Sequence, residues 1–342
     1  MDTFRQARRL ATICVLALVV SACGGSGGDG DDESLQPLSV GLTTFNSLHL
    51  PILMARDEKL MEPFGIDLEI NTFQNTGQII PALLSGSLDI GTATPEQMFA
   101  AQDEEPELKM ICSEVSTNPY SLIVSPNIKT IDDLKGKTIG VTGIGASADY
   151  FTAVLMLEDA GLKEKQDYTF INAGPPAQRA TALIEGQVDA VMSFEPDAQK
   201  LVDKGMKSIA EASELDNLHD VIIAMYMAKQ GWYEDEDNHE LAVDFFRGYL
   251  ASVEWLYDPA NKSRAVDIIA KQMKVSDKAA TATYDKFVTE LKAYPKDGRI
   301  DPAFLETTAK NAKIAGVKAA PAIDSLPDRY DNSLVEEAAK QK

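Results

Sequence analysis

The 342-residue sequence has little cysteine and little histidine, with three residues of each. Three cysteines are too few to staple a scaffold through disulfides, and the histidines are scattered at His49, His219 and His239. We therefore expect neither a disulfide framework nor a clustered His/Cys metal site. No cofactor is expected.

Basic residues are also scarce relative to acidic ones, 32 Lys and Arg against 53 Asp and Glu, which gives a formal net charge of −21. Nucleic-acid binding depends on Lys and Arg that neutralise phosphates, so we expect no nucleic-acid partner. Hydrophobic residues (44%) and charged residues (25%) are at the level of ordinary globular proteins. A chain of this length has room for two compact units, or for one unit with two lobes.

The apolar run at residues 10–22 is too short to span a membrane as a mature helix. Arg5, Arg8 and Arg9 precede it and small residues end it, which is the order of a secretory signal. Its end, Val-Ser-Ala followed by Cys23, resembles the lipobox of a bacterial lipoprotein. We expect residues 1–22 to be removed and Cys23 to be lipidated. Ordinary signal cleavage beside an incidental cysteine is the alternative.

Residues 24–34 are rich in glycine, serine and acidic side chains, a composition that stays flexible and extended. We expect residues 23–37 to tether a soluble body to the outer face of a membrane. Cys112 is then the one thiol of that body, because Cys14 leaves with the signal. A free cysteine is usually a small buried hydrophobe, and we expect Cys112 to be one.

From residue 38 the chain alternates strand and helix patterns. We expect strands at 38–43, 66–73 and 88–92, and helices at 51–60 and 78–84. This βαβ rhythm predicts parallel sheets that are covered by helices.

An internal match about one hundred residues apart divides the pattern into two similar halves. Residues 82–90 align with 182–190, and each stretch reads as a helix end, a glycine cap, a solvent-facing aspartate and an entering strand. Residues 40–43 align with 139–142 in the same way. The match predicts two similar α/β lobes, although single βα units can share such patterns by chance.

Ligands of open α/β sheets bind outside the carboxyl ends of the strands. In two facing lobes, four loops would meet there, at residues 43–46, 93–96, 143–147 and 193–195. We therefore expect a ligand site in a cleft between the lobes.

The order and spacing of these motifs resemble the periplasmic-type solute-binding proteins of the nitrate, sulfonate and taurine class, which also includes binders of thiamine precursors. The resemblance covers most of residues 38–275, and residues 131–140 are similar to the family's entry to its second lobe. The matching stretches are Val40–Asn46, Leu83–Gly91, Ile131–Tyr150 and Ala182–Pro196.

The resemblance implies an α/β, bilobed periplasmic-binding-protein type II fold. Each lobe would hold a parallel or mixed sheet with helices on both faces, and two crossovers would form the hinge. Lobe one is expected at 38–126 plus 222–342 and lobe two at 127–221, with hinge strands at 121–125 and 221–228.

Gly143, Gly145, Ala146 and Ser147 lie in one of the predicted cleft loops, between a strand and a helix. Glycines let backbone N–H groups approach a ligand, and a helix N-terminus favours negative charge, so this loop is a candidate anion site. A plain tight βα turn is the alternative. The glycine spacing fits neither a dinucleotide fingerprint nor a nucleophile elbow.

The sulfonate and taurine binders are similar in this loop and carry an aromatic residue that corresponds to Tyr150. This chain departs from them at Asp149, where they often carry histidine, and the departure leaves the ligand open. No arginine lies in a predicted cleft loop, so an anion would depend on helix N-termini and hydroxyl groups.

Two carboxylates, Glu96 and Glu195, are expected to face the cleft and to recognise an amino group or another N–H donor. For Glu96 the alternative is an acid that complements a helix start. Glycoside hydrolases also use a pair of carboxylic acids for catalysis, but nothing else in the chain supports a sugar site.

The other expected ligand contacts come from the same loops and from one crossover. Their hydroxyl and amide groups would hydrogen-bond a ligand, and aromatic rings, including that of Trp232, would stack on it or pack in a core. These residues are Thr44, Phe45, Asn46, Ala93, Thr94, Asn118 and Phe194.

Together these features predict a lipid-anchored receptor, not an enzyme, that delivers a small organic solute to an ABC permease and its ATPase. A sulfonate or taurine-like solute is the best match, and a thiamine-precursor pyrimidine or another aromatic or carboxylate solute is the alternative. Two other classes stay open: a pyrimidine-forming enzyme, whose family branch carries a cysteine-rich motif, and a lipid-anchored sensor. We expect a monomer at the bacterial cell envelope.

Overall fold

The computed structural model describes residues 35–73, 76–145 and 147–341 of the chain. The expected signal peptide, the lipidated Cys23, most of the tether and Ala146 lie outside the described residues. Residues 35–342 form one compact unit. In the described part, no helix is both long enough and apolar enough to span a membrane.

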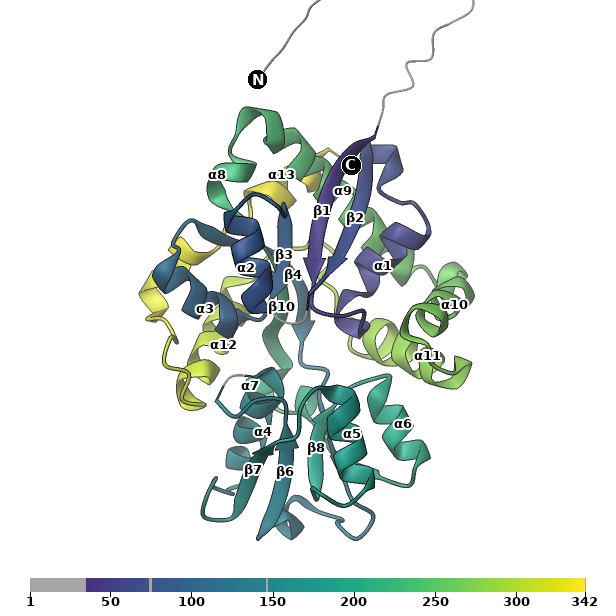
Figure 1. Ribbon diagram of the computed structural model, residues 1–342, viewed down its shortest axis with the longest axis vertical. Helices are drawn as coiled ribbons and strands as arrows, with labels where there is room; N and C mark the ends of the chain where they lie inside the picture. Colours follow the sequence, from purple (N-terminus) through teal and green to yellow (C-terminus); the bar gives the residue numbers. More distant parts are fainter. Residues whose placement is uncertain (1–34, 74–75, 146, 342) are drawn as a thin grey trace, which may run out of the picture. The chain divides into compact units, whose positions relative to one another are not determined.

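The first sheet has five strands in the order β2-β1-β3-β10-β4 (Figure 1). β1 runs parallel to β2 and β3, whereas β10 runs antiparallel to β3 and β4. Its strands are β1 (Gln36–Leu42), β2 (Ile66–Thr72), β3 (Ile90–Ala93), β4 (Leu108–Thr117) and β10 (Asp220–Lys229).

The second sheet repeats this plan in the order β7-β6-β8-β5-β9. β6 is parallel to β7 and β8, and β5 is antiparallel to β8 and β9. Its strands are β5 (Ser121–Val124), β6 (Lys137–Val141), β7 (Tyr168–Asn172), β8 (Ala190–Ser193) and β9 (Lys207–Glu211). The mixed sheets of a two-lobed α/β fold are therefore confirmed.

Helices cover both faces of the first sheet. One face packs against α1 (Leu50–Asp57), α9 (Glu236–Tyr257), α10 (Lys262–Met273), α11 (Asp277–Tyr284) and α13 (Ser333–Lys340), with the short α8 (Gln230–Tyr233) beside them. The other face packs against α2 (Thr76–Leu84), α3 (Pro95–Glu104) and α12 (Pro302–Ile314).

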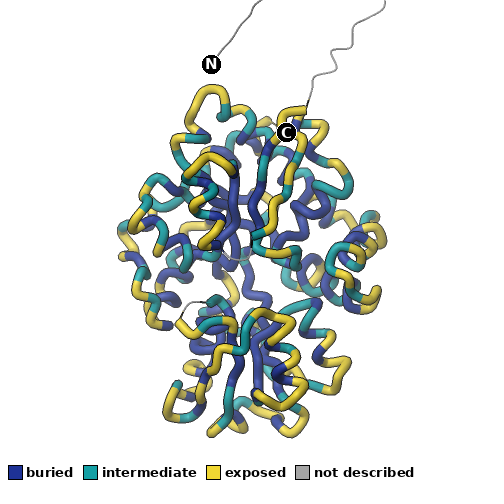
Figure 2. The backbone as a smooth tube through the Cα atoms, viewed as in Figure 1, coloured by how far each residue is buried: buried dark blue, intermediate teal, exposed yellow. Residues whose placement is uncertain are grey.

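The second sheet is covered in the same manner. α4 (Ala148–Asp159) and the short α7 (Asp216–His219) pack on one face. α5 (Pro176–Ile184) and α6 (Asp197–Asp203) pack on the other. The inner strands of both sheets are mostly buried, whereas exposed residues gather on the outer helices and turns and on the edge strands β2, β7 and β9 (Figure 2). Cys112 of β4 is fully buried, as predicted.

The two copies of the internal repeat have the same backbone conformation at the glycine after the second helix of each copy. Gly86 and Gly186 follow α2 and α5, and both have φ of +71°. The aspartates after them are predicted to face solvent, but each is half-buried and accepts a backbone hydrogen bond from another strand of its own sheet, β1 in the first sheet and β6 in the second. Asp89 accepts from the Ser39 amide at 2.8 Å, and Asp189 accepts from the Thr138 amide at 3.0 Å.

The predicted lobe boundary at residue 126 is wrong by one strand. β5 pairs with β8 and β9, so residues 121–124 belong to the second sheet and not to a hinge strand of the first. The chain passes between the sheets at residues 118–120 and returns where α7 meets β10. β10 itself lies in the first sheet, in agreement with the expected range 221–228.

Candidate functional site

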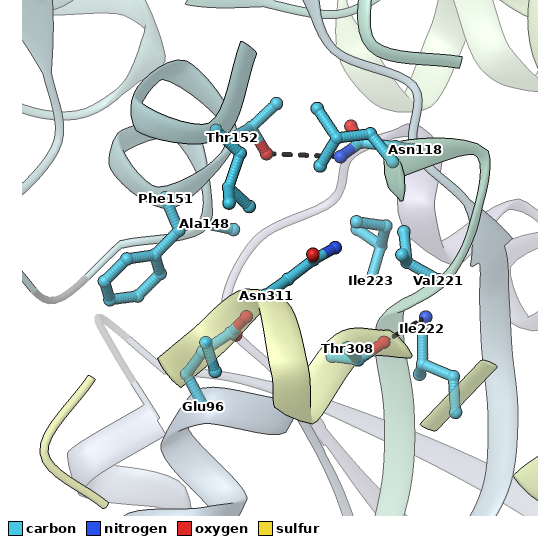
Figure 3. A pocket seen from close by; sticks show the side chains of 13 residues that line it. Glu96, Asn118, Ala148, Phe151, Thr152, Val221, Ile222, Ile223, Thr308 and Asn311 are labelled. Atoms are coloured by element: carbon cyan, nitrogen blue, oxygen red, sulfur yellow. Dashed lines mark hydrogen bonds between the residues drawn. The ribbon is translucent and has the colours of Figure 1, made fainter. Parts of the chain in front are cut away.

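A small pocket of about 30 Å³ is lined by residues from both lobes (Figure 3). Its apolar wall includes Phe151 and Leu155 of α4 and the residues at the start of β10, such as Val221 and Ile223. The polar side chains that line it are Glu96, Asn118, Thr152, Thr308 and Asn311. Of the four predicted loops, only 93–96 contributes a lining residue, Glu96, although the lining residue Ala148 directly follows the loop after β6.

Glu96 lies in the first turn of α3, which begins at Pro95. Figure 3 shows its carboxyl group directed toward the Asn311 side chain. Its Oε2 atom is buried and has no hydrogen-bond partner among the described residues. Burial raises the pKa of this carboxyl group, and hydrogen bonds from its own backbone N–H and from Thr94 oppose that rise. Glu96 is therefore an acid in the first turn of a helix and also lines the pocket, and its expected contact with an amino group stays a prediction.

The other polar side chains of the pocket are fixed by protein partners. Asn118 Nδ2 donates to Thr152 Oγ1 at 3.2 Å, and its Oδ1 accepts from the Tyr120 amide. Thr308 Oγ1 accepts from the Ile222 amide at 2.9 Å. Asn118 thus ties the first crossover to α4, and its expected contact with a ligand stays a prediction.

Asn311 links the two lobes in a similar way at the second crossover. Its Nδ2 donates to the carbonyl of Asn217 in α7, so α12 of the first lobe holds the end of the second lobe. Sequence reasoning missed Thr152, Thr308 and Asn311. Asn311 and Thr308 lie about 200 residues after Glu96, on the inner face of an ordinary amphipathic helix, and no motif marks them.

The pocket has no basic side chain among its described lining residues. The buried cation nearest to the second-lobe loop is Arg179, and its Nη1 lies 2.9 Å from Asp149 Oδ2. Both side chains are at most 3% exposed, and Asp149 also accepts from the Thr142 amide at 2.7 Å. Asp149 therefore neutralises Arg179, and the pair fixes the start of the loop after β6.

The loop after β6 is tied to its own residues and to β7, where the Ile144 amide donates to Asn172 Oδ1 at 2.9 Å. Gly145 has φ of +73°, a conformation that favours glycine. The Ser147 hydroxyl donates to the Gly143 carbonyl at 2.8 Å and accepts from the Gly143 amide at 3.0 Å. This geometry is the tight turn that was the alternative interpretation, and the expected role of Ser147 as an anion donor stays a prediction.

The loop after β1 meets the loop after β8. Ser47 Oγ donates to the Glu195 carbonyl oxygen, which joins the two lobes at a second place. Asn46 begins the short helix at Ser47–His49, accepts from the Leu48 amide at 2.8 Å, and donates to the exposed Thr44. The predicted meeting of these two loops is therefore present in the structure.

Glu195 and Phe194 have structural partners at this junction. Glu195 Oε2 accepts from the Gln199 amide at 2.8 Å, which caps α6, and burial raises the pKa of its carboxyl group. The ring of Phe194 contacts Tyr120 edge-to-face with centroids 5.0 Å apart, and it contacts Phe287 of the first lobe at 6.0 Å. Phe194 thus bridges the two lobes' cores.

Several predicted ligand contacts lie elsewhere. Tyr150 is packed in the second core against Phe170, with its hydroxyl bonded to Glu164 at 2.9 Å, because its position in α4 faces the sheet. Trp232 lines a different hollow beside Gly86, at the opposite end of β3. The remaining three have local roles: Ala93 is in the core, the Thr94 amide bonds Gln97, and Phe45 lies under the Arg56 guanidinium.

Comparison with known proteins gives a family match over more than half of the chain. The model of the family described as NMT1/THI5 like matches residues 46–262. The provisionally named binding protein YtlA of Bacillus subtilis (strain 168) is 23% identical over 303 residues, which cover 86% of this chain and 85% of YtlA.

Solved structures share the fold. One is the provisionally assigned periplasmic sulfonate-binding protein SsuA of a sulfonate ABC transporter from Methylobacillus flagellatus KT, with a TM-score of 0.70 and 19% identity over 90% of this chain and 95% of that one. Another is the desulfurization enzyme DSZB, with a TM-score of 0.64 and 15% identity over 89% of this chain and 99% of that one. The fold therefore occurs in both a binding protein and an enzyme.

Proposed function

Because the chain belongs to the NMT1/THI5 like family, we propose that it is the extracytoplasmic solute receptor of an ABC importer. The observation that carries the proposal is the pocket between two lobes of repeated topology, with Glu96 on one side and α4 on the other. A solute bound there would contact both lobes and stabilise their closure, and the closed surface would be read by a permease.

The solute of this proposal is a small organic molecule. A sulfonate or taurine-like solute is the first class to test, in keeping with the sulfonate-binding name of a fold neighbour. Because no basic side chain lines the described pocket, a sulfonate would depend on backbone dipoles of the loop after β6. A pyrimidine or another small aromatic or carboxylate solute is the second class.

An enzyme of the same fold is the competing function, since DSZB shares the architecture. The described pocket contains one carboxyl group and no cysteine, histidine or serine, and its two threonine hydroxyls are bonded to Asn118 and to the Ile222 amide, so no nucleophile paired with a base is found among the described lining residues. This composition favours a receptor. Turnover of any retained molecule by the purified protein would favour the enzyme instead.

Native mass spectrometry of the protein as purified tests the receptor function. We expect the wild type to retain a small molecule and Ala148→Trp to lose it, because the larger ring would fill the pocket that Ala148 lines. Ala100→Trp places the same side chain on the exposed face of α3 and should leave retention unchanged. Equal retention by both variants would contradict the location of the site.

We also propose that Cys23 carries a lipid and that residues 24–34 serve as its leash. The lipobox-like sequence before Cys23 supports this proposal. Cys23→Ser should release the protein from membranes, whereas Cys14→Ser should not. Soluble wild-type protein of a mass that begins elsewhere than at residue 23 would contradict it.

A further inference from the structure

One carboxyl oxygen at the pocket, Glu96 Oε2, is in an unusual environment. It is buried and has no hydrogen-bond partner among the described residues, and no other side-chain nitrogen or oxygen of the described pocket lining shares that state. Burying a carboxylate without a partner is costly, and native proteins rarely keep such a group without a reason. The structure therefore contains an unused acceptor at the pocket.

The neighbouring polar groups do not supply what Glu96 lacks. Asn118 Nδ2 donates to Thr152 and its Oδ1 accepts from Tyr120, and Asn311 Nδ2 donates to Asn217. These bonds hold both crossovers in place, and none of them reaches Glu96 Oε2. The oxygen is therefore open to a donor from a molecule that enters the pocket.

Charge balance leads to the same conclusion. The described lining has one acid and no base, and the buried Arg179 is already paired with Asp149. A buried acid with no protein cation nearby favours a ligand that brings positive charge or an N–H donor, because charge-assisted hydrogen bonds are the strong ones.

The size and walls of the pocket define the group that enters. A volume of about 30 Å³ has room for a small polar group of the solute. Phe151, Leu155 and Val221 would surround the carbon that carries this group. An amino or ammonium nitrogen on a short alkyl or benzylic carbon fits both the oxygen and the apolar wall.

We propose that the solute of this receptor inserts an amino or ammonium group between α3 and α12 and donates its N–H to Glu96 Oε2. The proposal rests on the receptor function proposed above and adds the chemical class of the group that specifies the solute. An anionic group at the other end of the same solute is compatible with it, and a solute without an N–H donor is not.

Matched probe pairs test the inference by isothermal titration calorimetry. Taurine and ethanesulfonate share a sulfonate and differ in the amine, and benzylamine and benzyl alcohol differ in the same way. We expect the amine of at least one pair to bind at least 10-fold more tightly than its partner, and Glu96→Gln to weaken it by about 10- to 100-fold. Glu104→Gln removes an exposed charge from the same helix and should change nothing.

The molecule retained on purification gives a second readout. Glu96→Gln should retain less of it than wild type and Glu104→Gln, with circular dichroism as the check on folding. Glu96→Asp keeps the charge but shortens the reach, and it should lose an intermediate amount. Equal retention by Glu96→Gln and wild type, or equal affinity for both members of every pair that binds, would overturn the inference and leave the receptor intact. A folded wild type that retains nothing and binds none of the four probes would instead overturn the receptor function, and the inference with it.

Discussion

Two acids of this protein, the buried Asp149 and the half-buried Glu96, differ in the hydrogen-bond partners of their carboxyl groups. Asp149 is 2% exposed and has three: the guanidinium of Arg179 and the amide and hydroxyl of Thr142. Glu96 Oε2 has none among the described residues. The first carboxylate is part of the architecture, because its bonds hold the loop after β6. The second has spare bonding capacity at a pocket, and the same residue type therefore serves a different purpose.

Removal of the buried Arg179 guanidinium should destabilise the folded protein. Arg179→Met leaves Asp149 uncompensated in the core, and we expect the free energy of unfolding to fall by about 3–5 kcal/mol. Urea unfolding followed by circular dichroism measures the change. Arg264→Met is the matched control, because Arg264 pairs with Glu58 at the surface with 56% of its side chain exposed, and it should cost about 1 kcal/mol or less. Similar losses for both variants would contradict the structural role of Arg179.

The secondary-structure elements were the most predictable part of the molecule. The repeat, with glycine after each second helix, determined two similar lobes from the sequence because glycine is the residue that tolerates the left-handed cap. The side chains of the pocket were less predictable. Glu96 and Asn118 were found because they follow strands, but Asn311 comes from a helix of the other chain segment. Only the crossovers bring it to α4, and no local pattern records that.

Tyr150 is a second residue whose surroundings the sequence did not predict. Family resemblance placed an aromatic contact there, but the residue lies on the sheet-facing side of α4 and packs on Phe170. Sequence spacing locates a residue on an element, and the rotation of the helix decides which partner it meets. The lobe boundary failed for a similar reason, since β5 could extend either sheet until its partners β8 and β9 are known.

The two equivalent caps give a prediction for the element scale. Gly86→Ala and Gly186→Ala should each lower the free energy of unfolding by about 1–2 kcal/mol, because both positions have φ of +71° and a Cβ is disfavoured there. No atom lies within 4 Å of either added Cβ, so the loss comes from the backbone alone. Gly231→Ala, in a helix with equal free space, should be neutral or stabilising in thermal denaturation. A neutral result at both caps would show that they are not left-handed in solution.

At the scale of the whole molecule, the two lobes are joined by more than the two crossovers. The segment Asp285–Glu290 of the first lobe contributes two contacts to the second: Phe287 meets Phe194, and Lys286 Nζ lies 3.2 Å from Glu211 Oε2. Lys286 also pairs with Glu290 at 2.6 Å. Its side chain is only 15% exposed, so this ion pair is less screened than those at the surface. These contacts bias the equilibrium between lobe arrangements that a receptor would use.

Lys286→Met tests that bias. Without the ammonium group, Glu211 and Glu290 lose their shared partner across the lobes, and we expect the ligand-free protein to expand in small-angle X-ray scattering. The apparent Kd for the retained solute should rise by about 5- to 10-fold, because fewer molecules occupy the lobe arrangement that binds it. Lys310→Met removes an ion pair with Glu306 that lies within α12 and should alter neither quantity. An unchanged radius of gyration together with unchanged or tighter binding would mean that Lys286 stabilises its own segment and does not set the position of the lobes.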